Sequence, residues 1–289
     1  MRLARTKLGF FRLPLRPGGP PGLVHALAPA LRRWGSPPGV LWLVLMALAA
    51  GLATLSAASP EGFVTYAQNV FDKALVRWQK EAGDPTAAWE LGRACFDLAE
   101  FSTNRTQKAE IAEQGLTACR RGLLRASNSP ALHYYLAMNL AQMARTKSLG
   151  ALKLVGQMEK EYQAASKLDE LIDFAGPHRY LGMLYRDAPA LVSIGDRAQA
   201  RKHLERAVAL APNYPDNHLA LVESYLKWGE RGNARRQLDA LAASLPAVRA
   251  ALAGPAWASH WAEWDSDFAR FERQAAEPAK GGRPVKDQP

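Results

Sequence analysis

Two segments of this chain repeat each other at a spacing of 34 residues. Residues 195–212 read GDRAQARKHLERAVALAP, and residues 229–246 read GERGNARRQLDALAASLP. Seven of the 18 aligned positions are identical. A recurring unit of this length indicates one supersecondary element that stacks on copies of itself, because a single copy cannot bury its apolar face alone. The sequence therefore predicts a repeat architecture.

The first half of the unit also recurs, but at a longer spacing. Leu181-Gly182 and Tyr185 correspond to Leu221-Val222 and Tyr225, which lie 40 residues further along the chain. The difference predicts a six-residue insertion after Tyr185, within residues 186–195.

The composition of the unit favours helices over strands. Alanine and leucine are abundant, strong strand formers are sparse, and prolines fall mainly between apolar stretches. Small residues at Gly182 and Ala200 would let two antiparallel helices approach closely. Pro212 and Pro246 are expected to stop the second helix of their units.

This 34-residue pattern resembles the tetratricopeptide (TPR) repeat. The resemblance is strict over residues 178–246 and looser over about 80–250. It implies an all-α, right-handed superhelix of antiparallel helix pairs. Upstream, residues 88–95 are expected to pair with 111–126, and residues 132–144 with a long helix over 152–174.

Two further helices are expected outside the repeats. Residues 63–80 place apolar side chains on one face and should pack on the first repeat. The second carries an aromatic stripe: Trp257, Trp261, Trp264, Phe268 and Phe271. We interpret it as a cap on the last repeat, with homo-oligomer formation or partner binding as alternatives. The repeat domain is thus expected over 59–275, followed by a disordered tail over 276–289.

The N-terminal part differs sharply from the rest. Residues 1–58 hold seven of the basic residues and no acidic one, so they carry +7 of the net charge of +10. A basic, proline-rich leader over 1–38 precedes an apolar segment over 39–58, whose core reads VLWLVLMALAAGLATLSAA. Nineteen such residues can cross a bilayer. We therefore expect one N-terminal hydrophobic helix, either a transmembrane anchor or a signal sequence removed before Ser59.

The charge distribution also predicts where the repeats lie. Arginines that precede an apolar span remain in the cytoplasm, which directs the following chain to the other side. In a bacterium this means a single-pass inner-membrane protein with a periplasmic domain, or a protein secreted to the periplasm. Because the remainder of the chain is only weakly basic, nucleic acid is not expected as a partner.

The sequence offers little chemistry for catalysis. Motifs for phosphate binding, zinc hydrolysis and activated serine are missing, and the six histidines show no metal-ligand spacing. We therefore expect no enzyme activity, cofactor or metal. The two cysteines, Cys95 and Cys119, are expected on the paired helices of one repeat. There they could form a disulfide or remain as two buried thiols.

The TPR resemblance implies specific binding positions on the concave face. First-helix positions of each repeat line that face, and the candidates for binding are Trp89, Arg93, Tyr134, Met138, Arg179, Met183, Arg186 and Glu223. Aromatic and methionine side chains beside arginines suit an extended peptide or an apolar ligand with an anionic end. Arg179 and Arg186 lie two turns apart on one helix face and are expected to be exposed there.

The expected function is a non-enzymatic scaffold that binds another protein or a peptide segment. Its membrane contact would be the N-terminal helix. The leader, the degenerate repeats and the segment PHRYLGMLYRDAPALVSIGDRAQARKHLERAVALAP also look like the T-component (TatT) proteins of TRAP transporters. That resemblance implies an alternative function, a periplasmic partner that assists ligand handling with a solute-binding protein. The chain departs from that family in lacking a cysteine for a lipid anchor.

Overall fold

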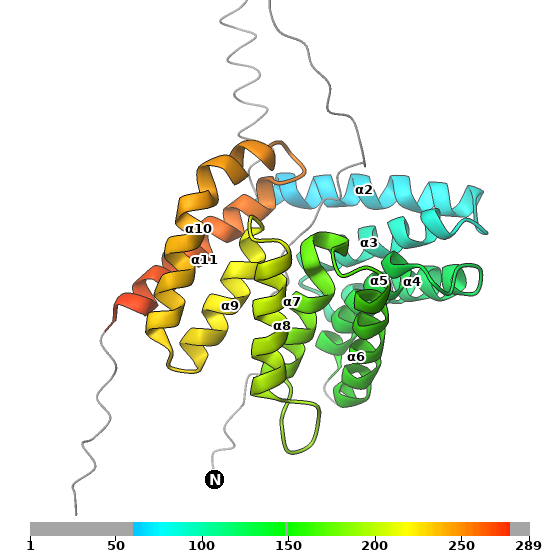
Figure 1. Ribbon diagram of the computed structural model, residues 1–289. Helices are drawn as coiled ribbons and strands as arrows, with labels where there is room; N and C mark the ends of the chain where they lie inside the picture. The colour runs from blue at the N-terminus through cyan, green and yellow to red at the C-terminus, as the bar shows by residue number, and fades with distance from the viewer. Residues whose placement is uncertain (1–59, 148–149, 278–289) are drawn as a thin grey trace, which may run out of the picture.

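The computed structural model describes residues 60–147 and 150–277, and all regular secondary structure in these ranges is α-helical (Figure 1). The helices are α2 (Pro60–Lys80), α3 (Pro85–Phe101), α4 (Arg105–Leu123), α5 (Pro130–Thr146), α6 (Ala151–Leu168), α7 (Ile172–Asp187), α8 (Arg197–Leu210), α9 (Pro215–Lys227), α10 (Arg231–Ala251) and α11 (Ala258–Ala276). The prediction of an all-α fold is confirmed.

Four helix pairs build the body of the molecule. The pairs α3/α4, α5/α6, α7/α8 and α9/α10 pack side by side, and each pair also contacts the next one. Short connections make consecutive helices antiparallel, as the repeat pattern predicts. The expected six-residue insertion lies within the connection from α7 to α8, where Leu191 is 98% exposed.

Local sequence signals start half of these helices. The side chains of Asp84, Asn104, Ser129 and Asp196 accept hydrogen bonds from backbone amides in the first turn of α3, α4, α5 and α8. Helices α3, α5 and α9 also have proline in the first turn, where its missing N–H costs nothing.

Small residues allow the paired helices to approach closely, as expected. A methyl group on Gly182 of α7 would lie 2.5 Å from Leu204 Cγ of α8. A methyl group on Gly92 of α3 would collide with Cys119 Sγ of α4. Cys95 and Cys119 do lie on paired helices, and the structure holds both as free, buried thiols. Burial raises the pKa of both thiols well above the ordinary value.

The prediction of one long helix over residues 152–174 is wrong. Helix α6 ends at Leu168, and α7 already begins at Ile172. Asp173, Phe174 and Ala175 adopt left-handed backbone angles, with φ of 56°, 54° and 61°. A periodic pattern of apolar residues cannot reveal such a turn, because the contacts that hold it come from other helices.

The expectation that Pro246 stops its helix is also wrong. Helix α10 continues through Pro246 to Ala251 and buries Val248. The carbonyl of Leu252, just after this extension, accepts a 2.6 Å hydrogen bond from Trp261 Nε1 of α11. Packing against α11 thus outweighs the local cost of proline. Pro212 does follow the end of α8, as expected.

The first and last described helices pack on the first and last repeats, respectively. Helix α2 packs on α3, and α11 packs on α9 and α10. Figure 1 shows α2 running across one end of the body towards α11, and the two helices are in contact. Among the described residues, no helix is long and apolar enough to cross a membrane. The predicted leader and apolar segment lie outside the described residues, as does the tail beyond Glu277.

Candidate functional site

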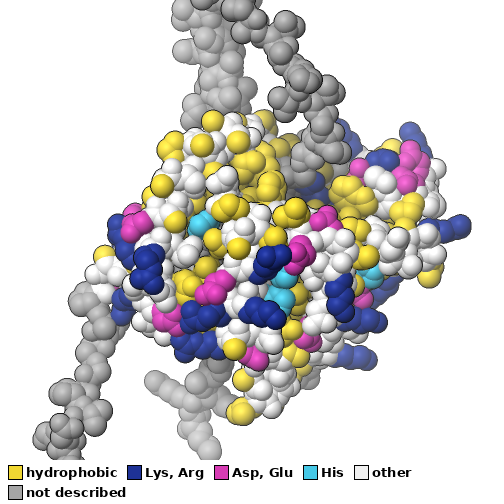
Figure 2. Space-filling view, in the orientation of Figure 1, with side chains coloured by type: hydrophobic (Ala, Val, Ile, Leu, Met, Phe, Trp, Pro, Cys, Tyr) yellow, Lys and Arg dark blue, Asp and Glu magenta, His cyan; other side chains and the backbone are white. Residues whose placement is uncertain are grey.

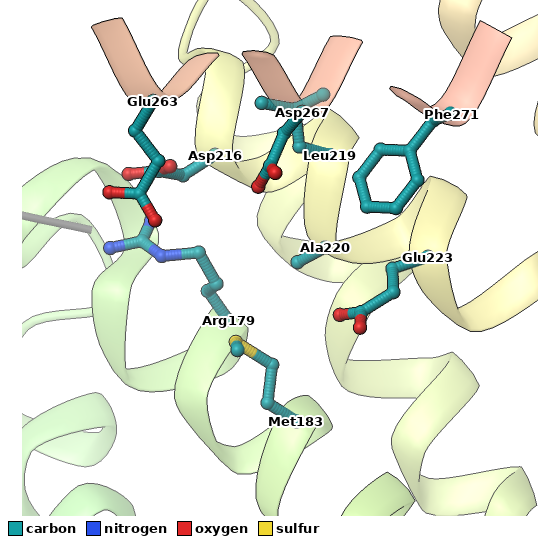
Figure 3. A pocket seen from close by; sticks show the side chains of 9 residues that line it. All are labelled: Arg179, Met183, Asp216, Leu219, Ala220, Glu223, Glu263, Asp267 and Phe271. Carbon is teal, nitrogen blue, oxygen red and sulfur yellow. The ribbon is translucent and has the colours of Figure 1, made fainter. Parts of the chain in front are cut away.

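A small pocket lies between three helices in the C-terminal half. Its volume is about 40 Å³, and Figure 3 shows its lining side chains converging from α7, α9 and α11. The lining residues are Arg179, Met183, Asp216, Leu219, Ala220, Glu223, Glu263, Asp267 and Phe271. It therefore combines an apolar floor with a ring of charged groups.

The charged groups of the pocket are mostly acidic. Four carboxylates and one guanidinium line it. The carboxylates of Glu223 and Asp267 reach solvent, since their side chains are 31% and 20% exposed. The Arg179 side chain is only 1% exposed. The basic partners of these two carboxylates, Lys227 and Arg270, are 44% and 40% exposed, so a group that enters from solvent meets paired charges of both signs before it meets Arg179.

Arg179 is held by a dense set of contacts. Its guanidinium donates a 2.7 Å hydrogen bond to Asn217 Oδ1 and lies 3.5 Å from a carboxylate oxygen of Asp173. It also lies 4.9 Å from the ring centre of Tyr180 and 5.2 Å from that of Tyr214. A buried arginine needs such compensation, since removing its charge from water is expensive.

The left-handed turn at the start of α7 is part of the same network. Arg179 and Asn217 both donate hydrogen bonds to the carbonyl of Phe174. The Tyr134 hydroxyl donates to the Asp173 carboxylate, and the Phe174 ring stacks on Tyr214 at 4.4 Å. Three consecutive non-glycine residues in this region cost roughly 1–2 kcal/mol each. Contacts from α5 and α9 are therefore required to hold this turn.

A second arginine, Arg186, lies beside the pocket and also forms ion pairs. Arg186 pairs with Asp187 at 2.7 Å and with Glu223 at 2.8 Å, and its side chain is 3% exposed. Lys227 contacts the same two carboxylates at 3.0 and 3.4 Å. Burial alone would raise the pKa of Asp187, but Arg186 and Lys227 outweigh it and hold the pKa below its ordinary value.

Helix α11 contributes Glu263, Asp267 and Phe271 to the pocket, while the rest of its aromatic stripe packs on the repeats. Trp257, Trp261, Trp264 and Phe271 are all buried. Trp264 Nε1 donates a 2.7 Å hydrogen bond to Asp216 Oδ1, which fixes α11 against α9. The stripe therefore covers the end of the repeats, and the pocket is what remains open between α11 and the first helices of the last two repeats.

The structure brings together only part of the predicted binding set. Arg179, Met183 and Glu223 line the pocket, and Arg186 binds Glu223 beside it. The other four predicted residues lie elsewhere: Trp89 stacks on Tyr135, Arg93 pairs with Asp97 at 3.6 Å, and Tyr134 and Met138 are fully buried.

The expectation that Arg179 and Arg186 are exposed is wrong. Both lie on the predicted face of α7, but α9 and its neighbours bury them. Helical spacing determines which face a side chain occupies, whereas the next repeat and α11 determine whether that face meets water. Both arginines have carboxylate partners in the structure.

Six lining residues are not among the eight predicted binding residues: Asp216, Leu219, Ala220, Glu263, Asp267 and Phe271. Phe271 belongs to the aromatic stripe. Glu263 and Asp267 lie one turn apart on the same helix, α11. The spacing could have revealed that they share a face. It could not reveal that α11 turns this face towards α9.

Two histidines on different helices also come together. The Nδ1 atoms of His178 on α7 and His203 on α8 are 2.9 Å apart, and His178 Nε2 lies 3.0 Å from Glu170. Burial lowers the pKa of both imidazoles, that of His203 to about 4. Within the described residues, no cluster of three or more potential ligands for a metal ion is found.

The helix pairs, their order and their packing give the described residues a TPR-like helical-repeat fold. Comparison with solved structures agrees: the chain is similar to a thermophilic TPR protein from Thermus thermophilus, with a TM-score of 0.53 and 16% sequence identity. The match covers 74% of this chain and all of that one. This likeness shows the fold.

A family model adds a more specific similarity. Residues 63–170 match the model described as "Regulator of microtubule dynamics protein 1-3". The matched region contains α3, α4, α5 and α6 and most of α2, but not the pocket. No curated protein matches the chain.

Proposed function

We propose that this chain is a non-enzymatic scaffold that binds another protein through the groove formed by α7, α9 and α11. The observation that carries this proposal is the pocket itself. It lies at first-helix positions of two adjacent repeats, the positions that the TPR resemblance assigns to partner binding. The similar family over residues 63–170 is named as a regulator and not as an enzyme, which supports the same class of function.

The size of the pocket favours a side chain over a free ligand. Small-molecule sites usually measure about 300–1,000 Å³, whereas this pocket measures about 40 Å³. It has room for the end of one side chain. Ligand handling with a solute-binding protein therefore remains a prediction that rests on the sequence resemblance alone.

We further propose that the repeat domain works outside the cytoplasm, held by the N-terminal apolar segment or released after cleavage. The asymmetry of charge before residue 40 supports this orientation. An alkaline phosphatase fused after Pro289 should be active in a bacterial host. Activity only of a cytoplasmic reporter at the same position would refute the orientation, and the mature size on a gel would separate anchor from cleaved signal.

Site-specific crosslinking in intact cells tests the binding surface. A photoreactive amino acid at Lys227, whose side chain is 44% exposed at the edge of the pocket, should capture one discrete partner. The control is the same amino acid at Arg235, which is 54% exposed on α10. Equal capture from both positions would contradict a binding surface at the groove.

A further inference from the structure

We infer that the insertion between α7 and α8 anchors the partner by placing two apolar side chains in an apolar pocket of that protein. The inference rests on the proposed function, because it adds a second contact to the protein that binds the groove. The insertion loop comprises residues 189–194, which read PALVSI and carry no charge.

The insertion loop is added to a turn that is complete without it. In the last repeat, the amide of Glu230 donates a 2.8 Å hydrogen bond to the carbonyl of Tyr225 and closes the turn between α9 and α10. The equivalent bond in the preceding repeat runs from the amide of Asp196 to the carbonyl of Tyr185, at 2.9 Å, and spans six residues more. The repeat therefore keeps its closing contact, and the six inserted residues are not needed to join its helices.

Both ends of the loop are held firmly. Gly195 lies so close to Ala188 that a methyl group on Gly195 would be 2.0 Å from the Ala188 carbonyl oxygen. Ile194 packs against the hydrophobic core, and Arg197, just after the loop, pairs with Glu230 at 2.6 Å. A compact loop whose ends meet in this way is frequently functional, and a fixed tip loses less conformational entropy on binding than a mobile one.

The tip of the loop is apolar and exposed. Leu191 is 98% exposed, and the adjacent Val192 is 68% exposed. Figure 1 shows the loop projecting past the ends of α7 and α8, on the side of the body away from α2. Single exposed apolar residues are common on protein surfaces, but the packing of this repeat does not explain two neighbours at the end of a held, inserted loop. Their burial by a partner would contribute to affinity, since removing apolar surface from water is favourable.

The loop is continuous with the groove. Asp187, the last residue of α7, lies two residues before the loop and pairs with Lys227 at 3.0 Å and with Arg186 at 2.7 Å. Arg186 in turn pairs with Glu223 of the pocket. A protein that lies in the groove and passes Lys227 therefore reaches the base of the loop. This continuity places the tip beside the same partner as the groove.

The charges at the base of the loop describe the rim of the partner's pocket. Arg197 and Lys227 are 56% and 44% exposed, whereas the carboxylates that pair with them, Glu230 and Asp187, are 22% and 12% exposed. Asp196 is also exposed, but its carboxylate accepts hydrogen bonds from two amides of α8. The cations therefore extend further into solvent than their partners. An apolar pocket bordered by acidic groups is the chemistry that matches this surface.

Two other occupants fit the loop less well. A lipid bilayer would also take leucine and valine, but α2 directly follows the segment proposed to hold the membrane, and the loop projects from the other side of the body. A second copy of this chain would offer the pocket between α7, α9 and α11, whose charged lining does not suit a leucine side chain. Crosslinking distinguishes both occupants from a different protein.

The experiment compares a photoreactive amino acid at Ala190, next to the exposed leucine, with the same amino acid at Lys227 in intact cells. We expect the two positions to capture the same protein, and position 190 to reach it through a segment rich in apolar residues. Leu191→Ser should reduce capture from position 227 about five- to tenfold, because the loss of one buried leucine weakens binding by about that factor. Leu191→Met keeps the apolar volume and should restore capture to within about twofold.

Leu124→Ser is the matched control. Leu124 is 85% exposed at the end of α4, so the substitution makes the same chemical change on another repeat. Both serine variants should keep the melting temperature of the unaltered chain, since neither leucine is buried. Only Leu191→Ser should reduce capture, and equal effects of the two variants would overturn the inference.

The outcomes also separate this inference from the scaffold proposal. Capture from position 227 that is unchanged by Leu191→Ser would show that the loop is no anchor, while the scaffold stands. Crosslinks from position 190 to phospholipid, or to a second copy of this chain, would likewise overturn the inference by naming a different occupant. If capture from 227 does not exceed capture from 235, the scaffold proposal itself fails.

Discussion

The two ends of this helical array are covered in different ways. Helix α11 buries four of its five stripe residues and is fixed to α9 by the hydrogen bond from Trp264 to Asp216. Helix α2 buries only Ala67 and Phe71, while Val64, Tyr66 and Val76 are 40–48% exposed. Helix α2 is tied to its neighbours by contacts nearer the surface, since the 39% exposed Arg77 side chain pairs with Glu90 on α3. The comparison shows that the two helices differ in how deeply their contacts are buried.

The polar contacts differ between the two halves as well. The pocket network buries Arg179 and Arg186, and both have at least two polar partners. In the N-terminal half, the pair Arg120–Glu113 is more than half exposed and spans 3.6 Å. Figure 2 shows basic and acidic side chains interspersed over the visible face, without one large patch of a single sign. The N-terminal half also holds a largely buried pair, Arg145–Glu100 at 2.5 Å, with both side chains 13% exposed. The most deeply buried arginines among the described ion pairs are nevertheless Arg179 and Arg186, in the C-terminal half.

The largest effect should come from removing the anchor of α11. Trp264→Ala removes a side chain that is only 2% exposed, and it also removes the hydrogen bond that Trp264 donates to Asp216. We expect a loss of about 4–6 kcal/mol in the free energy of unfolding. Tyr66→Ala on α2 should cost less than about 1 kcal/mol. Chemical denaturation followed by circular dichroism measures both, and equal losses would show that the two ends are anchored alike.

Arg179→Ala tests whether the buried network supports the C-terminal half. It removes the guanidinium that binds Asn217 and the carbonyl of Phe174, and it leaves Asp173 without this cation. The expected loss is about 3–5 kcal/mol. Arg120→Ala, in the exposed pair, should change stability by about 0.5 kcal/mol or less. An unchanged melting temperature for Arg179→Ala would show that this side chain does not stabilise the fold, which would leave partner binding as its role.

The histidine pair predicts acid sensitivity in the α7/α8 pair. Because burial lowers the folded-state pKa of His203 from 6.5 to about 4, its contribution is fully present above pH 6.5 and is lost as pH falls towards 4. The charged or titratable groups around it are His178, Glu170, Tyr185, Lys202 and Arg206. After discounting for partial exposure, we expect a loss of about 1 kcal/mol.

Hydrogen exchange can locate this acid effect. Between pH 6.5 and 4.5, amides of α7 and α8 should lose more protection than those of α3 and α4, after correction for the intrinsic exchange rate. In His203→Gln the difference between the two pairs should shrink. A uniform loss over all helices would place the acid-sensitive groups elsewhere.

The smallest effect concerns the left-handed turn. Ala175→Gly relieves a backbone held at φ of 61°, a gain of roughly 1–2 kcal/mol, and removes a buried methyl worth about 0.8 kcal/mol. We expect a net stabilisation of about 0.5 kcal/mol. Ala200→Gly, at an equally buried position of regular helix α8, should instead destabilise by about 1–2 kcal/mol. Destabilisation at both positions would contradict a strained turn.

Much of the architecture was predictable because its signals are local. The 34-residue spacing, the small residues at Gly182 and Ala200, and the insertion after Tyr185 indicated helix pairs and their order. These features act between residues close in sequence, where helix geometry and proline or glycine effects apply directly. The same reasoning found the apolar face of α11, since a stripe at spacings of three and four residues needs no partner to be recognised.

The pocket depended on contacts that no local pattern encodes. Arg179 meets Asn217 across 38 residues of chain, and Trp264 meets Asp216 across 48. These contacts bury the two arginines and hold α11 against α9, and they place Glu263 and Asp267 at the opening. The sequence by itself determined that the chain forms helix pairs in this order. Only the tertiary structure decided that the arginines are buried and that the pocket is acidic, because burial and charge pairing depend on which distant segment packs against each face.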